Sequence, residues 1–271
     1  MSQITATQSL RPDRFDSAGR DQLVDIQDLQ AALPGLQRLR DWAHSALALR
    51  SGEQAIDIGS GTGSEVLLFA DKVGPSGEAV GVEPDPQLLA SAERRAAAAG
   101  SAARFVPGDA YGLPFGMDSF DAVLCERVFQ HLTRPQQAAR EIARVLRPGG
   151  RVVLCDADWG TAVVHPGDQA VARLVIDTLI AGTTNPYSGR RLAGLLAAEG
   201  LVVDDISSHA LIQDRGVGAG TLVAKVADMA VERMSLTVPQ RDQLVADLDV
   251  GAARGDIHVS VTMFAVLAHK P

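Results

Sequence analysis

Residues 56–63 read Ile56-Asp57-Ile58-Gly59-Ser60-Gly61-Thr62-Gly63. This pattern predicts a short buried strand that ends at a turn of alternating glycines, followed by an amphipathic helix from about Glu65. Glycine at every second position lets the backbone turn sharply, and a ligand can lie against the main chain without meeting a Cβ. The start of the helix then offers unpaired N–H groups. We therefore expect a ligand-binding turn here.

The spacing of the glycines in this turn differs from that of a dinucleotide-binding fold. A dinucleotide fold usually carries G-x-G-x-x-G, whose third glycine would fall at Ser64. Here the spacing is G-x-G-x-G, and an acid, Asp57, stands two residues before the first glycine. Glycine turns follow strands in many α/β proteins, so the motifs further along the chain have to decide.

Acidic residues follow the next two predicted strands. The strand Ala79-Val80-Gly81-Val82 ends in Glu83-Pro84-Asp85, at the spacing of one βαβ unit. A carboxylate there can accept two hydrogen bonds from a ribose diol, each worth roughly 1.5–3 kcal/mol. The strand near 103–107 leads into Gly108-Asp109-Ala110, where a carboxylate can accept an adenine amino group. A single such acid is more often solvated or a helix cap, so the order of the motifs carries the argument.

Two more motifs complete the series. A strand near 119–125 runs into Glu126-Arg127-Val128-Phe129-Gln130-His131, and residues 145–154 combine a helix end, a Pro-Gly turn and a fifth strand. The five motifs together resemble those of the class I S-adenosylmethionine (SAM) methyltransferases, in particular the ubiquinone/menaquinone-type branch that acts on small molecules. The resemblance covers residues 36–270. Residues 156–161 also resemble the D-x-D-W-G-T stretch of bacterial members of this branch.

The resemblance implies a fold, a cofactor and a set of site residues. The fold is α/β: a doubly wound, Rossmann-like, seven-stranded and mostly parallel sheet, whose last strand lies antiparallel between strands five and six. The cofactor is SAM, with S-adenosylhomocysteine as product, and Asp57 steers its amino-acid end directly or through water. The cofactor-binding residues that it implies are Asp57, Gly59, Ser60, Gly61, Gly63, Glu83, Pro84, Asp109, Ala110, Glu126 and Arg127.

Strands and helices alternate along the chain, which is typical of a parallel doubly wound sheet. We expect strands near 54–58, 78–83, 103–107, 119–125, 150–156, from 201 and at 258–267, and helices near 21–33, 34–49, 64–73, 86–99, 135–146, 167–182 and 190–199. Residues 1–50 are expected to form an N-terminal helical lid segment, and 51–271 the main domain. Insertions near 160–190 and 216–252 are expected to complete a helical lid over the cofactor and a small substrate.

His131 is the candidate catalytic base, because it follows strand four and the family's loop there faces the sulfonium. The alternative, that His131 caps or packs the next helix, stays open. Arg127 is expected to pair with Glu126 or to reach the substrate or cofactor. Trp159 is either a substrate wall or core. Asp156 and Asp158 are expected to be solvated loop acids, and His165 a weaker candidate for facing substrate.

Composition excludes several other functions. The formal charge of −8 and pI near 5.2 argue against a nucleic-acid substrate. The pairs Arg94-Arg95 and Arg190-Arg191 are expected on solvated faces. No apolar run is long enough to span a membrane, so we expect a cytoplasmic protein without membrane insertion. Cys125 and Cys155 are expected as buried free thiols, and no spacing indicates a metal site.

The expected function is methyl transfer from SAM to an O, N or C atom of a small, partly apolar metabolite, in natural-product or cofactor biosynthesis. The protein is expected to act as a monomer or homodimer. Two alternatives stay open. One is an enzyme that retains SAM but catalyses another reaction, such as a cyclisation. The other is a non-catalytic SAM-binding protein.

Overall fold

The computed structural model describes residues 33–212 and 219–271. Seven strands form one sheet in the order β3-β2-β1-β4-β5-β7-β6. The strands are β1 (Gln54–Ile58), β2 (Glu78–Glu83), β3 (Arg104–Pro107), β4 (Phe120–Glu126), β5 (Leu146–His165), β6 (Val202–Ile212) and β7 (His258–His269). The first five are parallel, and β7 runs antiparallel between β5 and β6. This confirms the expected doubly wound topology and the position of the last strand.

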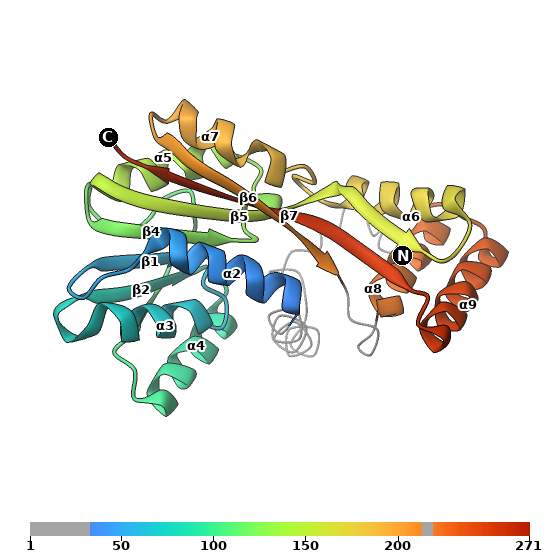
Figure 1. Ribbon diagram of the computed structural model, residues 1–271, viewed down its shortest axis with the longest axis horizontal. Helices are drawn as coiled ribbons and strands as arrows, with labels where there is room; N and C mark the ends of the chain where they lie inside the picture. Colours follow the sequence, from blue (N-terminus) through green and yellow to red (C-terminus); the bar gives the residue numbers. More distant parts are fainter. Residues whose placement is uncertain (1–32, 213–218) are drawn as a thin grey trace, which may run out of the picture.

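Helices cover both faces of the sheet (Figure 1). One face carries α2 (Pro34–Leu47), α3 (Ser64–Val73) and α4 (Pro86–Ala99), and the other carries α5 (Pro135–Val145) and α7 (Leu192–Ala198). The apolar stripe of each helix packs on alternate residues of the strands, which gives two cores separated by the sheet. The helix expected near 21–33 lies outside the described residues.

Strand β5 is much longer than the 150–156 expected from the sequence. It continues to His165 and pairs with β7 as far as His258. The register shifts between Asp158 and Val163, so residues 159–162 form a bulge rather than the start of a loop. The strand resumes because the β-branched residues Val163 and Val164 pair with the β-rich end of β7.

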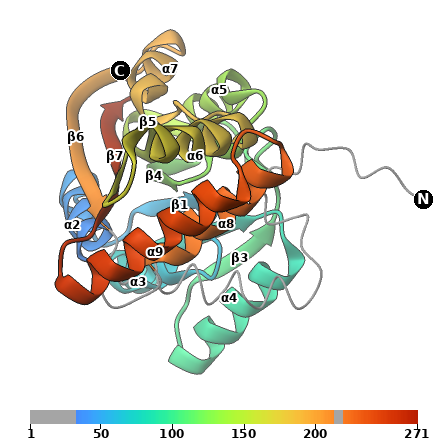
Figure 2. The same cartoon turned by 90° about the vertical axis from the view of Figure 1, so that its right-hand side faces the viewer.

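Three helices pack on this extension of β5 and β7: α6 (Gln169–Gly182), α8 (Ala219–Glu232) and α9 (Val238–Arg254). They share a third apolar core of their own. Figure 1 shows them beyond the carboxyl ends of the parallel strands, and in Figure 2, seen from that side, α8 and α9 pass in front of β1. The two expected insertions therefore meet in one helical unit. Residues 216–218 of the second lie outside the described part of the chain.

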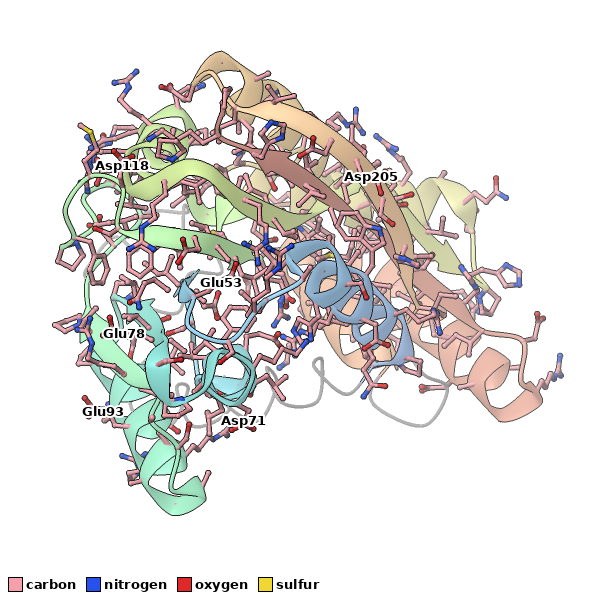
Figure 3. All side chains as sticks on the ribbon, turned by 60° about the vertical axis from the view of Figure 1, so that its left-hand side comes forward. Glu53, Asp71, Glu78, Glu93, Asp118 and Asp205 are labelled. Carbon is pink, nitrogen blue, oxygen red and sulfur yellow. The ribbon has the colours of Figure 1, made fainter. Side chains whose placement is uncertain are left out.

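The opposite, amino edge of the sheet carries paired charges. Figure 3 brings this side forward and labels Glu53, Glu78 and Asp118 on it. Their partners are Arg151 (2.7 Å), Arg104 (2.7 Å) and Lys270 (2.8 Å), respectively. These charges stabilise strand ends and lie away from the glycine turn. Within residues 33–212 and 219–271, no helix combines the length and apolar character needed to cross a membrane.

Candidate functional site

The glycine turn joins β1 to α3 in a conformation that glycine favours. The φ angles of Gly59, Gly61 and Gly63 are 76°, 53° and 84°. The Gly59 amide donates to the Val82 carbonyl at 2.8 Å, which fixes the turn beside the end of β2. A Cβ on Gly59 would overlap the Val128 side chain, and one on Gly63 would overlap Phe105 and Ala92. Close packing of the protein therefore requires two of the glycines, in addition to any ligand.

Glu83 reaches from the tip of β2 to this turn. One carboxylate oxygen accepts a hydrogen bond from the Gly61 amide, and the other accepts one from the Asp85 amide, both at 2.9 Å. Burial raises the pKa of Glu83, and the two amide bonds oppose that rise. Neighbouring Pro84 is exposed, and Asp85 caps α4. The geometry thus places an oriented acceptor between the turn and the second strand.

A cluster of charges lies on the other side of the turn, and helix α2 supplies its cations. Arg40 donates two hydrogen bonds of 2.9 Å to Glu126 at the end of β4. The same guanidinium lies 3.2 Å from Glu65, at the start of α3, and His44 contacts the other Glu65 oxygen at 2.5 Å. Burial acts to raise the pKa of Glu126, but the bond from Arg40 and the charge of Arg127 bring it below its usual value.

Arg40, His44 and Glu65 belong to this cluster but are not among the site residues predicted from the sequence. The sequence carries one indication of this cluster: Arg40 and His44 are four residues apart and lie beside the apolar stripe of α2. Two basic residues next to a buried stripe indicate a charged partner at the edge of the core. The sequence does not say which of the many acids that partner is.

Asp57 lies at the centre of this cluster. It is 4% exposed, and among the described residues no group donates a hydrogen bond to its carboxyl. Burial raises the pKa of Asp57 well above its usual value. The charges of Glu65 and Glu126 add to the effect, and Arg40 partly offsets it. Buried polar groups in folded proteins almost always have a partner. A buried acid without one at a ligand-type turn fits a polar ligand.

The loop after β4 carries the remaining candidates on that side. Arg127 has a φ of 58°, an uncommon conformation for a residue other than glycine, and its Nε lies 3.2 Å from Glu126. This is the local pair expected from the sequence. His131 ends a short 3-10 turn over Phe129–His131 and is partly exposed. Its backbone amide donates to the Val128 carbonyl at 2.9 Å.

The loop after β3 is tied to the segment that follows His131. Asp109 is exposed and accepts a hydrogen bond from the Tyr111 amide at 2.8 Å, whereas Ala110 is buried. The Tyr111 hydroxyl accepts a hydrogen bond from the Thr133 amide at 2.9 Å. Tyr111 thereby connects the loop after β3, where adenine is expected, to the segment after His131, where the methyl acceptor is expected.

Ser60 contributes differently from its neighbours in the turn. Its amide donates to the Val82 carbonyl at 3.1 Å. Its hydroxyl is buried beside Gly81, where a Cβ on that glycine would lie 2.6 Å from the oxygen, and it has no hydrogen-bond partner among the described residues. The side chain is therefore a small filler between β1 and β2.

The expectation that Asp156 and Asp158 are solvated loop acids is wrong. Both carboxylates are fully buried, because β5 continues past its expected end and their side chains point to the same face of the strand. Asp156 accepts hydrogen bonds from the amides of Gln130 (2.8 Å) and Ala157 (2.7 Å). Asp158 pairs with Arg190, whose side chain is 52% exposed, in agreement with the solvated face expected for it.

These acids attach the segment 183–191 to the loop after β4. Burial raises the pKa of Asp156 to about 7, although its hydrogen bonds to Gln130, Ala157 and Ser188 oppose the shift. The Trp159 indole donates to the Gln130 side chain at 3.0 Å, and the Asn185 amide donates to the Gln130 carbonyl at 2.9 Å. Gln130 is thus held from both sides, next to His131 in the chain.

The remaining candidates lie away from this cluster. His165 ends β5, is exposed and lies 3.3 Å from Asp256. Cys125 and Cys155 are buried free thiols on adjacent strands, as expected. Burial raises the pKa of both thiols. In the described part of the chain, no group of three His, Cys, Asp or Glu side chains has an arrangement that could hold a metal ion.

Comparisons with known proteins agree with the geometry. Residues 56–154 match the family model described as a methyltransferase domain. The ubiquinone/menaquinone biosynthesis C-methyltransferase of Ectopseudomonas mendocina is 31% identical over 74% of this chain and 74% of its own length. An uncharacterised 37.1 kDa protein in a transposon of Streptomyces fradiae is 33% identical over 71% of this chain, which spans 55% of that protein.

Other curated relatives are also longer than the matched region. The demethylmenaquinone methyltransferase of Thermus thermophilus is 36% identical over 42% of this chain and 53% of its own length. Among solved structures, the YcgJ protein of Bacillus subtilis matches with a TM-score of 0.58 at 22% identity, covering 84% of this chain and 98% of that one. This structural likeness shows a shared fold.

Proposed function

The chain belongs to the class I SAM-dependent methyltransferases of the ubiquinone/menaquinone type, and from this premise we propose that it transfers a methyl group from SAM to a small, partly apolar metabolite. The observation that carries the proposal is Asp57, a buried acid without a hydrogen-bond partner among the described residues, beside the glycine turn. We place the reaction in natural-product or cofactor biosynthesis, at an oxygen, nitrogen or carbon acceptor. The enzyme acts in the cytoplasm as a monomer or homodimer.

The donors and acceptors around the turn match the groups of SAM. Asp57 and Glu126 accept hydrogen bonds from its α-ammonium, while Arg40 stays paired with Glu126 and Glu65. Glu83 accepts from the ribose hydroxyls, and Asp109 from the adenine amine. Pro84, Ala110 and Arg127 belong to the same three loops. A pyrophosphate, by contrast, would meet four buried or nearly buried carboxyl groups, those of Asp57, Glu65, Glu83 and Glu126.

SAM, when bound, supplies a methyl group already activated by a sulfonium. The chain then has to hold the acceptor atom in line with that methyl, which lowers a barrier by at most about 7–11 kcal/mol. His131 removes the proton from an acceptor that carries one, an effect of roughly 10²–10⁴-fold. Asp156, through the Gln130 amide, positions the turn that carries His131.

The helical unit of α6, α8 and α9 closes over the acceptor. Its position beyond the carboxyl ends of the parallel strands supports this role (Figure 1). Limited proteolysis with and without S-adenosylhomocysteine tests it. We expect the cofactor product to protect residues 160–190 and 216–252. Identical cleavage in both conditions would contradict a ligand-coupled lid.

Turnover tests the reaction itself. The purified protein is incubated with SAM and a panel of quinones, phenols, indoles and amines, and both the methylated product and S-adenosylhomocysteine are quantified by mass spectrometry. We expect the two to accumulate in equal amounts with a cognate acceptor. An acceptor that is converted while SAM stays intact would instead indicate a non-methylating reaction, such as cyclisation.

A further inference from the structure

The Asp57 carboxyl differs from the other acids of the site in having no counter-ion of its own. Glu126 receives two hydrogen bonds from Arg40 and a third cationic contact from Arg127. Glu65 is contacted by Arg40 and His44. Asp57 is 4% exposed and receives no hydrogen bond from a described residue.

The groups that face Asp57 come from every element packed around it. Helix α2 supplies Arg40 and His44, α3 supplies Glu65, and the end of β4 supplies Glu126 and Arg127. Glu83 approaches from β2, and the Cys125 thiol on β4 lies within electrostatic range of Asp57. The two guanidiniums are already engaged by Glu126 and Glu65. A third ionised carboxylate would therefore stand in a low-dielectric site without a cation.

We propose that Asp57 carries a proton in the cofactor-free protein and releases it to the solvent when the amino-acid end of the cofactor binds. The α-ammonium of SAM or S-adenosylhomocysteine supplies the cation that the protein withholds from Asp57. The O–H bond of the carboxyl breaks, its electron pair stays on the carboxylate oxygen, and the buffer takes the proton. This inference rests on the proposed function, because it places the ammonium beside Asp57.

A consequence is that cofactor affinity depends on pH. Below the pKa of Asp57 in the free protein, one proton is released for each ligand bound. The Kd for S-adenosylhomocysteine then falls about tenfold for each unit of rising pH. Burial and the neighbouring carboxylates raise the pKa of Asp57, which extends this range upward. A ligand without the amino-acid end should show no such dependence.

Calorimetry in buffers of different ionisation enthalpy measures the proton directly. S-Adenosylhomocysteine is titrated into the full chain in phosphate, PIPES and imidazole at about pH 6.5, where an α-amino group is still protonated. The slope of observed enthalpy against buffer ionisation enthalpy counts the protons exchanged. We expect net proton release for S-adenosylhomocysteine, rising towards one proton as the pH is lowered, following the linkage relation.

The matched ligand is 5′-methylthioadenosine, which keeps the adenine and ribose but lacks the ammonium and carboxylate. Titrated directly, or by displacement against S-adenosylhomocysteine, it should release close to no proton, so any contribution from Glu83 is seen separately. Folded Asp57→Asn should lose the proton release, whereas Asp71→Asn, at an exposed acid on α3 outside the site, should keep it.

Three results would overturn the inference: no proton release with S-adenosylhomocysteine, equal release with both ligands, or unchanged release in Asp57→Asn. In each of these the cofactor still binds, so the proposed function stands. A wild-type protein that binds neither ligand would instead remove the proposed function, and the inference with it.

Discussion

Arg40 and Glu126 are 86 positions apart in the chain, yet the Arg40 guanidinium donates two hydrogen bonds of 2.9 Å to the Glu126 carboxylate. The pair joins the N-terminal helix α2 to the carboxyl end of β4. Burial acts to lower the pKa of Arg40, but the bond to Glu126 and the charges of Glu126 and Glu65 raise it above its usual value. Arg40 is thus a permanent cation at the edge of the candidate site, and α2 borders that site.

Replacing Arg40 by methionine should destabilise the protein and weaken cofactor binding. The change leaves Glu126 buried with one fewer cation, and removing one partner of a buried pair costs about 3–5 kcal/mol. Chemical denaturation measures the loss in the free energy of unfolding. Arg38→Met, an exposed site on the same helix, is the control and should have little effect. Equal stability of the two variants would contradict the role of the pair.

Glu83→Gln should weaken S-adenosylhomocysteine binding by about 1.5–3 kcal/mol, because the carboxylate orients towards the turn and accepts charge-assisted bonds. Glutamine keeps the size but offers only one acceptor oxygen. Glu93→Gln, on the exposed face of α4 (Figure 3), is the matched control. Calorimetric affinities that are the same for both variants would remove Glu83 from the ribose site.

Asp156 should make stability fall as pH rises from about 4 to about 7. Its pKa in the folded protein is raised from 3.8 to about 7, so over this range the folded state binds more protons than the unfolded state. The stabilising contribution is present below pH 4 and is lost through pH 7. Asp156→Asn should flatten the curve of unfolding free energy against pH.

The flattening should be partial, because burial also raises the pKa values of Asp57 and Glu83. Asp71→Asn, an exposed acid on α3, should leave the curve unchanged. Urea denaturation at several pH values gives both curves. Identical pH dependence in the wild type and Asp156→Asn would contradict a raised pKa at this position.

Gly59 and Val128 should be energetically coupled. Gly59→Ala introduces a Cβ that overlaps the Val128 side chain. The new alanine must also keep the φ of 76° that Gly59 adopts. Strain of this kind costs about 1–3 kcal/mol. In a Val128→Ala background the overlap is relieved, so the same substitution should cost less. A double-mutant cycle of unfolding free energies measures the coupling, and strict additivity would show that the two side chains do not compete for space.

The sequence predicted which acids meet at one edge of the sheet, because each motif follows a strand directly. Asp57, Glu83, Asp109 and Glu126 lie where parallel strands end, so the topology alone brings them to one edge. Arg40 was not predictable in the same way. Its partner is far along the chain, and the apolar stripe of α2 predicts only that the helix packs on the sheet.

The burial of Asp156 and Asp158 in β5 was not predicted, for a different reason. Asp156-Ala157-Asp158 is polar and precedes Trp-Gly-Thr, a composition typical of a loop. The strand continues because β7 pairs with it, and residue alternation then points both carboxylates inward. Backbone amides, Ser188 and Arg190 supply partners that no local pattern reveals.

We propose that the acids around the glycine turn bind SAM rather than a dinucleotide. Calorimetric titration of the purified protein with S-adenosylhomocysteine, with NAD in parallel, tests it most directly. We expect micromolar or tighter binding of S-adenosylhomocysteine and no binding of NAD. Binding of NAD alone, or of neither ligand, would contradict it.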